Sequence, residues 1–159
     1  MKKIPIIAGV ITLVVGIGLS RRMIKKNIHK KVQKIDNENK FKDYYYMLNH
    51  WLMLKQSGVE IKQYFNDRGY KRIAIYGYGE MGKRVIDELK SSDICIEYVI
   101  DKNLTNNSGD IKFVGVDEEW PDIDAIIVTP IYAYEQILVD YSKKISAEFV
   151  SLEDIIYSC

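Results

Sequence analysis

Three glycines and one aspartate have the spacing of a site for a diphosphate and a ribose. Gly77, Gly79 and Gly82 form the pattern GxGxxG directly after the apolar run IAIY, and Asp101 ends the next apolar run. Gly77 permits a tight turn, Gly79 lets a diphosphate approach the main chain, and Gly82 lets the following helix pack closely. The Asp101 carboxylate would accept hydrogen bonds from ribose hydroxyls and repel a 2′-phosphate, so the spacing predicts NAD rather than NADP.

The predicted site includes the other residues of this turn and the end of a later strand. A helix that begins after the turn would present main-chain N–H groups and a partial positive charge to the phosphates. Thr129 and Pro130 end the apolar run AIIVTP, beside the crevice where the strand order reverses. The predicted cofactor-binding residues are Gly77, Tyr78, Gly79, Glu80, Met81, Gly82, Asp101, Lys102, Thr129 and Pro130.

Glu80 favours an alternative, in which the glycines serve backbone geometry alone and no ligand binds. Its negative charge falls in the first turn of the predicted helix, close to the expected phosphates. The side chain could instead point outward or hydrogen-bond a sugar hydroxyl.

The elements that would position these residues form an α/β domain. We predict a strand at 73–76, a helix through Val85, Ile86 and Leu89, and a second strand at 94–100. IKFVG, AIIVTP and AEFVSL predict three more strands, with a crossover helix in IYAYEQILVDYSKKI and a closing helical turn in EDIIYS. The expected fold is a Rossmann-like parallel sheet in the order 3-2-1-4-5.

A helical lead-in is predicted before the sheet. The polar stretch DNENK at 36–40 indicates a short linker. After it, an apolar stripe of Phe41, Tyr45, Leu48 and Leu52, widened by Met47 and Trp51 and expected to pack in the core, predicts a helix that ends near 57–58. A shorter helix follows and ends at Gly69. This hairpin is expected to cover a face or edge of the sheet, or to dimerise. The predicted domains are 1–36, 37–69 and 70–159.

The first 36 residues predict a membrane anchor. Residues 4–20 carry no charge and would span roughly 25 Å as a helix, enough for a short transmembrane span. A cleaved signal peptide and a buried core helix are the alternatives. The flanking basic residues predict that the C-terminal domain lies in the cytoplasm; they are Arg21, Arg22, Lys25, Lys26, Lys30, Lys31 and Lys34.

An apolar stripe follows the predicted span, formed by Ile24, Ile28, Val32 and Ile35. It predicts either a basic amphipathic helix on anionic lipids of the inner leaflet or a solvated helix whose charges only fix topology.

Composition restricts the classes of function. The net charge of +1 argues against nucleic acid as a partner. Cys95 and Cys159 lack metal-ligand or disulfide-framework spacing, and Cys95 is expected to be buried inside a strand. His29 and His50 precede the sheet, so we predict neither a metal site nor a catalytic set.

The segments FKDYYYMLNHWLMLKQSG, IAIYGYGEMG, YVIDKN, VTP and SLEDIIYS resemble small Rossmann proteins of bacterial polysaccharide biosynthesis, described as nucleoside-diphosphate-sugar epimerase-like. The resemblance covers roughly residues 40–157. It implies binding of a dinucleotide or nucleotide sugar by Gly77, Gly79, Gly82 and Asp101, in the context of cell-surface glycan assembly.

The sequence departs from true epimerases at their catalytic pair. Those enzymes use Tyr-x-x-x-Lys, whereas Tyr141 is followed by Lys143 and Lys144. Whether the chain is an enzyme therefore stays open. It could be a membrane-anchored binding module beside a glycan-synthesis enzyme, a half-site of an NAD-dependent epimerase or dehydratase completed by another subunit, or a nucleotide-sensing regulator. Its protein partner could be a glycan-synthesis enzyme or a second copy in a homo-oligomer.

Overall fold

The computed structural model describes the backbone of residues 4–102 and 111–159, and side chains from residue 25 onward within these ranges. The chain forms two compact units, Met1–Tyr44 and Tyr45–Cys159, here called unit 1 and unit 2. Helix α1 (Ile4–Gln56) begins in unit 1 and ends in unit 2.

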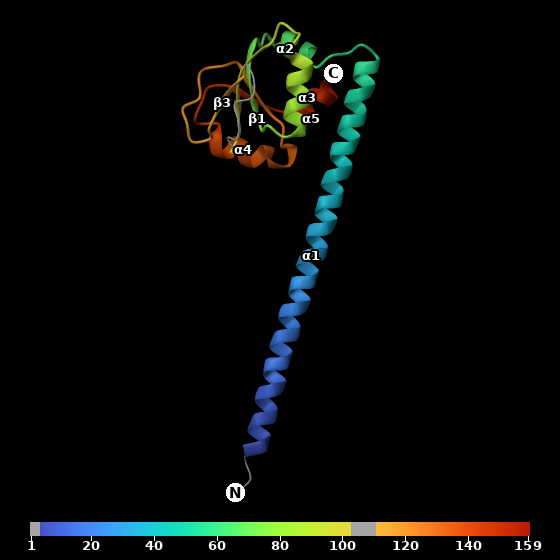
Figure 1. Ribbon diagram of the computed structural model, residues 1–159, viewed down its shortest axis with the longest axis vertical. Helices are drawn as coiled ribbons and strands as arrows, with labels where there is room; N and C mark the ends of the chain where they lie inside the picture. Colours follow the sequence, from blue (N-terminus) through green and yellow to red (C-terminus); the bar gives the residue numbers. More distant parts are fainter. Residues whose placement is uncertain (1–3, 103–110) are drawn as a thin grey trace. The chain divides into compact units, whose positions relative to one another are not determined.

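Unit 2 contains the predicted five-stranded parallel sheet (Figure 1). Its strands are β1 (Arg72–Tyr76), β2 (Cys95–Ile100), β3 (Lys112–Val114), β4 (Ala125–Val128) and β5 (Glu148–Ser151). Their order is β3-β2-β1-β4-β5, as the sequence predicts. Tyr76 pairs with Ile100 on one side and with Val128 on the other. The carboxyl ends of the three central strands are therefore level, and the residues that follow them leave the sheet at the same edge.

Successive side chains of a strand point to opposite sides, so the sheet has two faces. Helices cover both of them. Helix α3 (Glu80–Leu89) packs on the face that carries Ile75. Helix α4 (Tyr134–Tyr141) follows a short 3₁₀ turn, η1 (Ile131–Ala133), and packs against Ala74 and Tyr76 on the other face. Figure 1 shows α3 in yellow-green and α4 in orange.

Two short helices complete unit 2. Helix α2 (Lys62–Arg68) ends as predicted at Gly69, which has φ of 72° and donates its N–H to Asn66. Helix α5 (Leu152–Ser158) follows β5 directly and buries Leu152, Ile155 and Ile156.

The predicted linker at 36–40 is wrong, because α1 continues through it without a break. The stretch contains neither Gly nor Pro, and each of its charges has an opposite charge four residues away. Lys40 pairs with Asp36 at 2.7 Å, and Lys34 pairs with Glu38 at 3.9 Å. Pairs at this spacing stabilise a helix, so a polar segment need not interrupt one.

The predicted apolar face of the lead-in helix is wrong in its central stripe. Phe41, Tyr45, Leu48 and Leu52 are exposed, with exposed fractions of 73, 58, 37 and 56%. Met47 and Trp51, which widen that stripe, are the members that are buried. Both sets repeat at helical spacing, so periodicity alone did not distinguish the face that packs on the domain.

A buried carboxylate on α3 explains which face of α1 is used in unit 2. The Trp51 indole N–H donates to Glu88 Oε2 at 2.7 Å, and the main-chain N–H of Ile61 donates to Glu88 Oε1 at 3.1 Å. Lys55 lies 3.4 Å from the same carboxylate, whose side chain is 5% exposed. Glu88 thereby joins the end of α1, the start of α2 and α3.

Cys95 is exposed, which corrects the expectation of a buried thiol. Strand β3 pairs with β2 only from Tyr98 to Ile100, so the beginning of β2 extends past its neighbour. Cys95 stands in this uncovered part.

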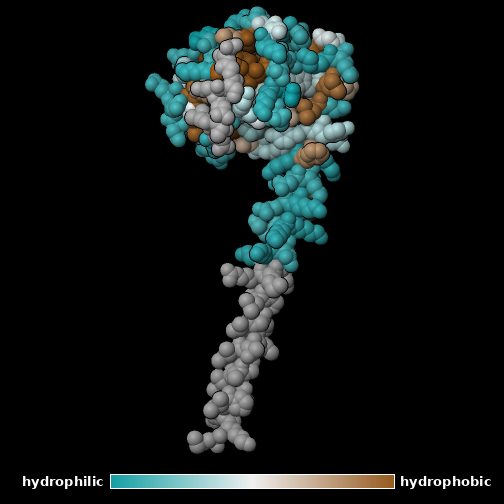
Figure 2. Space-filling model, in the orientation of Figure 1, coloured by the Kyte–Doolittle hydropathy of each residue, from teal (hydrophilic) through white to brown (hydrophobic). Residues whose placement is uncertain are grey.

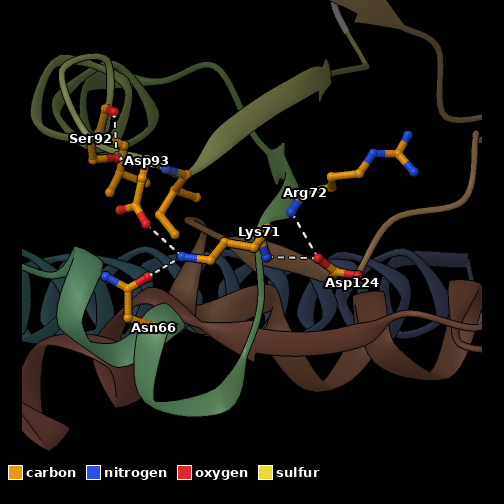
Figure 3. A network of polar contacts seen from close by, with 8 residues as sticks. Asn66, Lys71, Arg72, Ser92, Asp93 and Asp124 are labelled. Atoms are coloured by element: carbon orange, nitrogen blue, oxygen red, sulfur yellow. Dashed lines mark hydrogen bonds and ion pairs between the residues drawn. The ribbon is translucent and has the colours of Figure 1, made fainter.

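A polar network ties the amino ends of the strands together, at the sheet edge opposite the glycine turn (Figure 3). The Asp124 carboxylate accepts hydrogen bonds from the main-chain N–H groups of Lys71 and Arg72 at 2.7 and 2.8 Å. These bonds hold the pKa of Asp124 below its usual value, and the bond from Arg72 contributes more than the bond from Lys71. The Lys71 ammonium contacts Asn66 and Asp93. This edge is thus occupied by the chain's own polar groups.

Among the residues with described side chains, none of the helices is both long and apolar enough to cross a membrane. The predicted span at residues 4–20 and the first member of the following stripe, Ile24, lie outside that part of the chain.

Candidate nucleotide-binding site

The turn after β1 requires glycine at its first position. Gly77 has φ of 99°, in the left-handed region that favours glycine. A Cβ at Gly77 would lie 2.8 Å from Thr129 Oγ1 and 3.1 Å from Pro130 Cδ. The Gly77 N–H donates to Ile100 O at 2.8 Å, which extends the contact between β1 and β2 into the turn. The predicted tight turn is therefore present.

The second glycine faces open space at the start of α3. Gly79 is the N-cap residue of α3, and no heavy atom of the described residues lies within 4 Å of a Cβ built there. It provides no side-chain cap, whereas at α5 the Ser151 hydroxyl accepts a bond from the N–H of Glu153. The first N–H groups of α3 have no acceptor within the helix. An anion could approach them closely because Gly79 has no side chain.

The third glycine brings α3 against the turn. A Cβ at Gly82 would lie 2.1 Å from the carbonyl oxygen of Gly77 and 3.6 Å from Ile75 Cγ2. The first of these distances is shorter than any permitted contact, so a side chain here would push α3 away from the turn. Gly82 thus has the close-packing task that the sequence predicts.

Asp101 lies at the same turn. It is half-buried directly after β2, and its Oδ2 accepts a 2.7 Å hydrogen bond from the main-chain N–H of Tyr78. The carboxylate and the glycine turn are therefore adjacent, as a ligand that joins a diphosphate to a ribose would require.

Thr129 and Pro130 support the turn from the β4 side. The buried Thr129 hydroxyl lies 3.1 Å from the carbonyl oxygens of both Tyr76 and Gly77, to which it can donate its single hydrogen. Its main-chain N–H also donates to Tyr76 O. Both residues thus lie at the strand-order reversal, where they contact Gly77.

The side chains of the remaining predicted residues lie in different surroundings. The Tyr78 ring packs edge-on against Phe113, with a centroid distance of 4.8 Å, and the Lys83 ammonium lies 5.6 Å from the centroid of that ring. Met81 is half-buried in α3, and Lys102 is exposed. Sequence reasoning missed Phe113 and Lys83, and the aromatic character of Phe113 in a short edge strand was the one available signal.

Glu80 projects to the surface, one of the alternatives that the sequence left open. It is paired with Lys83 at 3.0 Å and with Arg84 at 3.6 Å. The hydrogen bond from Lys83 lowers the pKa of the Glu80 carboxyl, so this group is ionised at neutral pH. Its charge is compensated by two cations of its own helix, which reduces its repulsion of a nearby phosphate.

Among the residues that the structure describes, the Tyr141 ring is surrounded by other aromatic rings. The Tyr141 ring packs beside Trp120 and Tyr76, at centroid distances of 5.2 and 5.8 Å. Lys144 donates to the carbonyl oxygen of Val116 at 2.6 Å and lies over the Trp120 ring. This arrangement is a packing cluster rather than a Tyr–Lys general base. Within the described residues, no group of three or more His, Cys, Asp or Glu could hold a metal ion.

No family model, curated protein or solved structure matches this chain. The geometry of the glycine turn and its neighbours is therefore the basis for a functional assignment.

Proposed function

We propose that unit 2 binds NAD(H) or a nucleotide sugar, with the diphosphate over Gly79 at the amino end of α3. The observation that carries this proposal is the open, side-chain-free N-cap of α3 beside Asp101. A helix end of this kind binds anions through its main-chain N–H groups and its partial positive charge. The exposed, compensated position of Glu80 is compatible with a phosphate at this place.

Asp101 would recognise the ribose. A carboxylate has about four acceptor positions, so its bond with Tyr78 N–H is compatible with further bonds from ribose hydroxyls. The same negative charge would disfavour a 2′-phosphate, which supports NAD over NADP.

We infer binding without a complete active site. The two groups that an epimerase would use as its catalytic pair are not at the required spacing, and Lys144 contacts Val116 and Trp120 instead. A binding module that acts beside a glycan-synthesis enzyme fits these observations. The glycan context itself stays a prediction of the family resemblance.

We further propose that residues 4–20 anchor the chain in the cell membrane, with unit 2 in the cytoplasm. The support is the uncharged run itself and the seven basic residues that follow it within 21–34. Those nearest the run would also be attracted to anionic lipids of the inner leaflet. A reporter that works only in the cytoplasm should be active when it is fused after Cys159. Activity of a reporter that works only in the periplasm would contradict this topology.

Ligand binding can be tested on the full chain by thermal shift and calorimetry with NAD, NADP and a set of nucleotide sugars. Gly79→Val places a side chain in the open space at the α3 amino end, so we expect it to abolish the shift at an unchanged unfolding temperature. Glu119→Val, an exposed position between β3 and β4, is the control and should bind as the native chain does.

Two outcomes would contradict the proposal. In the first, none of these nucleotides changes the unfolding temperature of the native chain. In the second, a nucleotide binds Gly79→Val and the native chain equally, which would place its site elsewhere.

A further inference from the structure

The part of α1 that lies in unit 1 presents aliphatic side chains to water. Every side chain from residue 25 to residue 39 is exposed, and Ile28, Val32 and Ile35 have exposed fractions of 58, 58 and 49%. Isolated helices are marginally stable in water, because most helical stability comes from packing of an apolar face. This segment is mostly hydrophilic in the view of Figure 2, in keeping with its lysines. A partner that buries its narrow aliphatic stripe would therefore stabilise this segment.

The stripe has the spacing of a coiled-coil seam. Ile28, Val32, Ile35 and Asn39 follow one another at intervals of four, three and four residues. In heptad notation the two isoleucines take d positions, and Val32 and Asn39 take a positions. A β-branched residue at a favours two strands when leucine occupies d, and isoleucine at d shifts the preference towards more strands. The choice of two strands therefore rests on Asn39, because a single Asn at a fixes the register and the number of strands at some cost in stability.

Charges beside the seam are complementary between two parallel copies. Lys31 takes a g position and Asp36 takes the e position five residues later, which is the pair that meets across a parallel interface. Asp36 also pairs with Lys40 of its own helix at 2.7 Å, and one carboxylate can accept from both ammonium groups. Two-fold symmetry makes the contact between Lys31 and Asp36 twice.

The pairing becomes unfavourable after residue 39. The next g and e positions are Glu38 and Asp43, which carry like charges, and the next d position is Lys42. The favourable seam therefore does not extend beyond residue 39.

We propose that this segment pairs with the same segment of a second copy, as a short parallel two-stranded coiled coil in register. If residues 4–20 anchor the chain, both copies lie in one membrane with the same orientation, which raises their effective concentration and favours the parallel arrangement. That supporting point rests on the proposed anchor, whereas the seam and its charges do not.

A lipid surface is the competing occupant, and the continuity of α1 argues against it. No Gly or Pro occurs between residues 21 and 39, and α1 runs through this stretch unbroken. Sharp bends in helices almost always need such residues or a local defect. A helix that leaves the bilayer without a bend carries residue 39 about 28 Å beyond residue 20, at a rise of 1.5 Å per residue.

Site-specific disulfide formation tests the pairing in the full chain. The native thiols, Cys95 and Cys159, are first replaced by serine because both are exposed. Val32→Cys and Asn39→Cys, introduced separately at the a positions, should each give disulfide-linked dimers under mild oxidation. Lys30→Cys and Asn37→Cys occupy f positions on the outer side of the proposed pair, and we expect at least tenfold less dimer from them.

A mixture of the Val32→Cys and Asn39→Cys chains tests direction and register. A parallel pair in register should give only dimers that join like positions. Disulfides between position 32 and position 39 at comparable yield would contradict the proposed arrangement.

A charge exchange distinguishes the pairing from a structural effect within one helix. Asp36→Lys should weaken self-association at least tenfold in analytical ultracentrifugation, and adding Lys31→Glu should restore it. The unfolding temperature of unit 2 should stay unchanged in all three chains, since these residues lie in unit 1.

Several results would overturn the proposal. A monomeric or trimeric native chain contradicts a two-stranded pair, as does equal disulfide formation at a and f positions. Absence of dimers, together with a preference for anionic over neutral vesicles that Ile35→Lys reduces, would assign the stripe to the lipid surface instead.

Discussion

Asp101 and Tyr78 are joined by a 2.7 Å hydrogen bond, in which the carboxylate at the end of β2 accepts the main-chain N–H of the glycine turn. The proposed ribose acceptor therefore also holds the turn that would receive the diphosphate. One side chain links the two halves of the proposed site, so substitutions at Asp101 need to separate the loss of charge from the loss of the turn.

Asp101→Asn provides this separation. The amide oxygen can still accept the Tyr78 N–H, while the negative charge is lost. Hydrogen bonds to charged groups contribute about 1.5–3 kcal/mol, so we expect NAD affinity to fall roughly ten- to a hundredfold. Discrimination against NADP should fall as well. Calorimetry with both dinucleotides measures this, and Asp117→Asn, an exposed acid outside the turn, should leave both affinities unchanged.

Gly82→Ala should destabilise the fold, whereas Gly79→Ala should not. The added methyl group would meet the Gly77 carbonyl oxygen at 2.1 Å in the first variant and open space in the second. Overpacking of this kind costs typically about 1–3 kcal/mol. Urea unfolding followed by circular dichroism gives the two free energies. Equal stability of the two variants would show that α3 can move away from the turn without cost.

Glu88→Ala should be strongly destabilising. It would leave the Trp51 indole N–H and the Ile61 N–H without their carboxylate acceptor, and the loss of a buried acceptor costs about 1–3 kcal/mol for each group. The neighbouring Asp87 is exposed, so Asp87→Ala is a matched control with an expected change within about 0.5 kcal/mol. Chemical denaturation of the two variants compares them, and indole fluorescence reports the loosening of Trp51.

Asp124→Asn should change the pH dependence of stability. The pKa of Asp124 is depressed by the N–H groups of Arg72 and Lys71, so the folded state favours the ionised form. This contribution is present above the usual aspartate pKa and disappears as the pH falls through the depressed value in the folded protein. The native chain should therefore exceed the variant in stability at pH 7, and the difference should shrink below pH of about 4. Thermal unfolding from pH 2.5 to 7 tests this, and a constant difference would contradict it.

The sequence predicts the sheet well because its signals are local and redundant. Few conformations are open to the apolar runs at 73–76 and 125–128. The same holds for the glycines between strand and helix and for Gly69 at the end of α2. The same is true of the central part of the site. Gly77, Gly82 and Asp101 are placed as their spacing predicts, because a short βαβ unit with a tight turn has little freedom.

The errors lie where one local pattern allows two tertiary arrangements. The lead-in helix is apolar on two faces, and Glu88, which binds Trp51 from 37 residues away, determines which face is buried. Cys95 resembles a strand-interior residue, but β3 is too short to cover it. The polar stretch at 36–40 resembles a linker, and only its spacing of opposite charges indicates a helix.

The central position of β1 has a consequence for biosynthesis. β1 is the first strand to leave the ribosome, yet it pairs with β2 and with β4, whose residues follow about 20 and 50 positions later. β2 can cover one edge of β1, but the other hydrogen-bonding edge of Ile73–Tyr76 stays uncovered until β4 has been translated. Nascent chains halted before residue 125 should therefore recruit chaperones or aggregate, and release beyond β4 should relieve both.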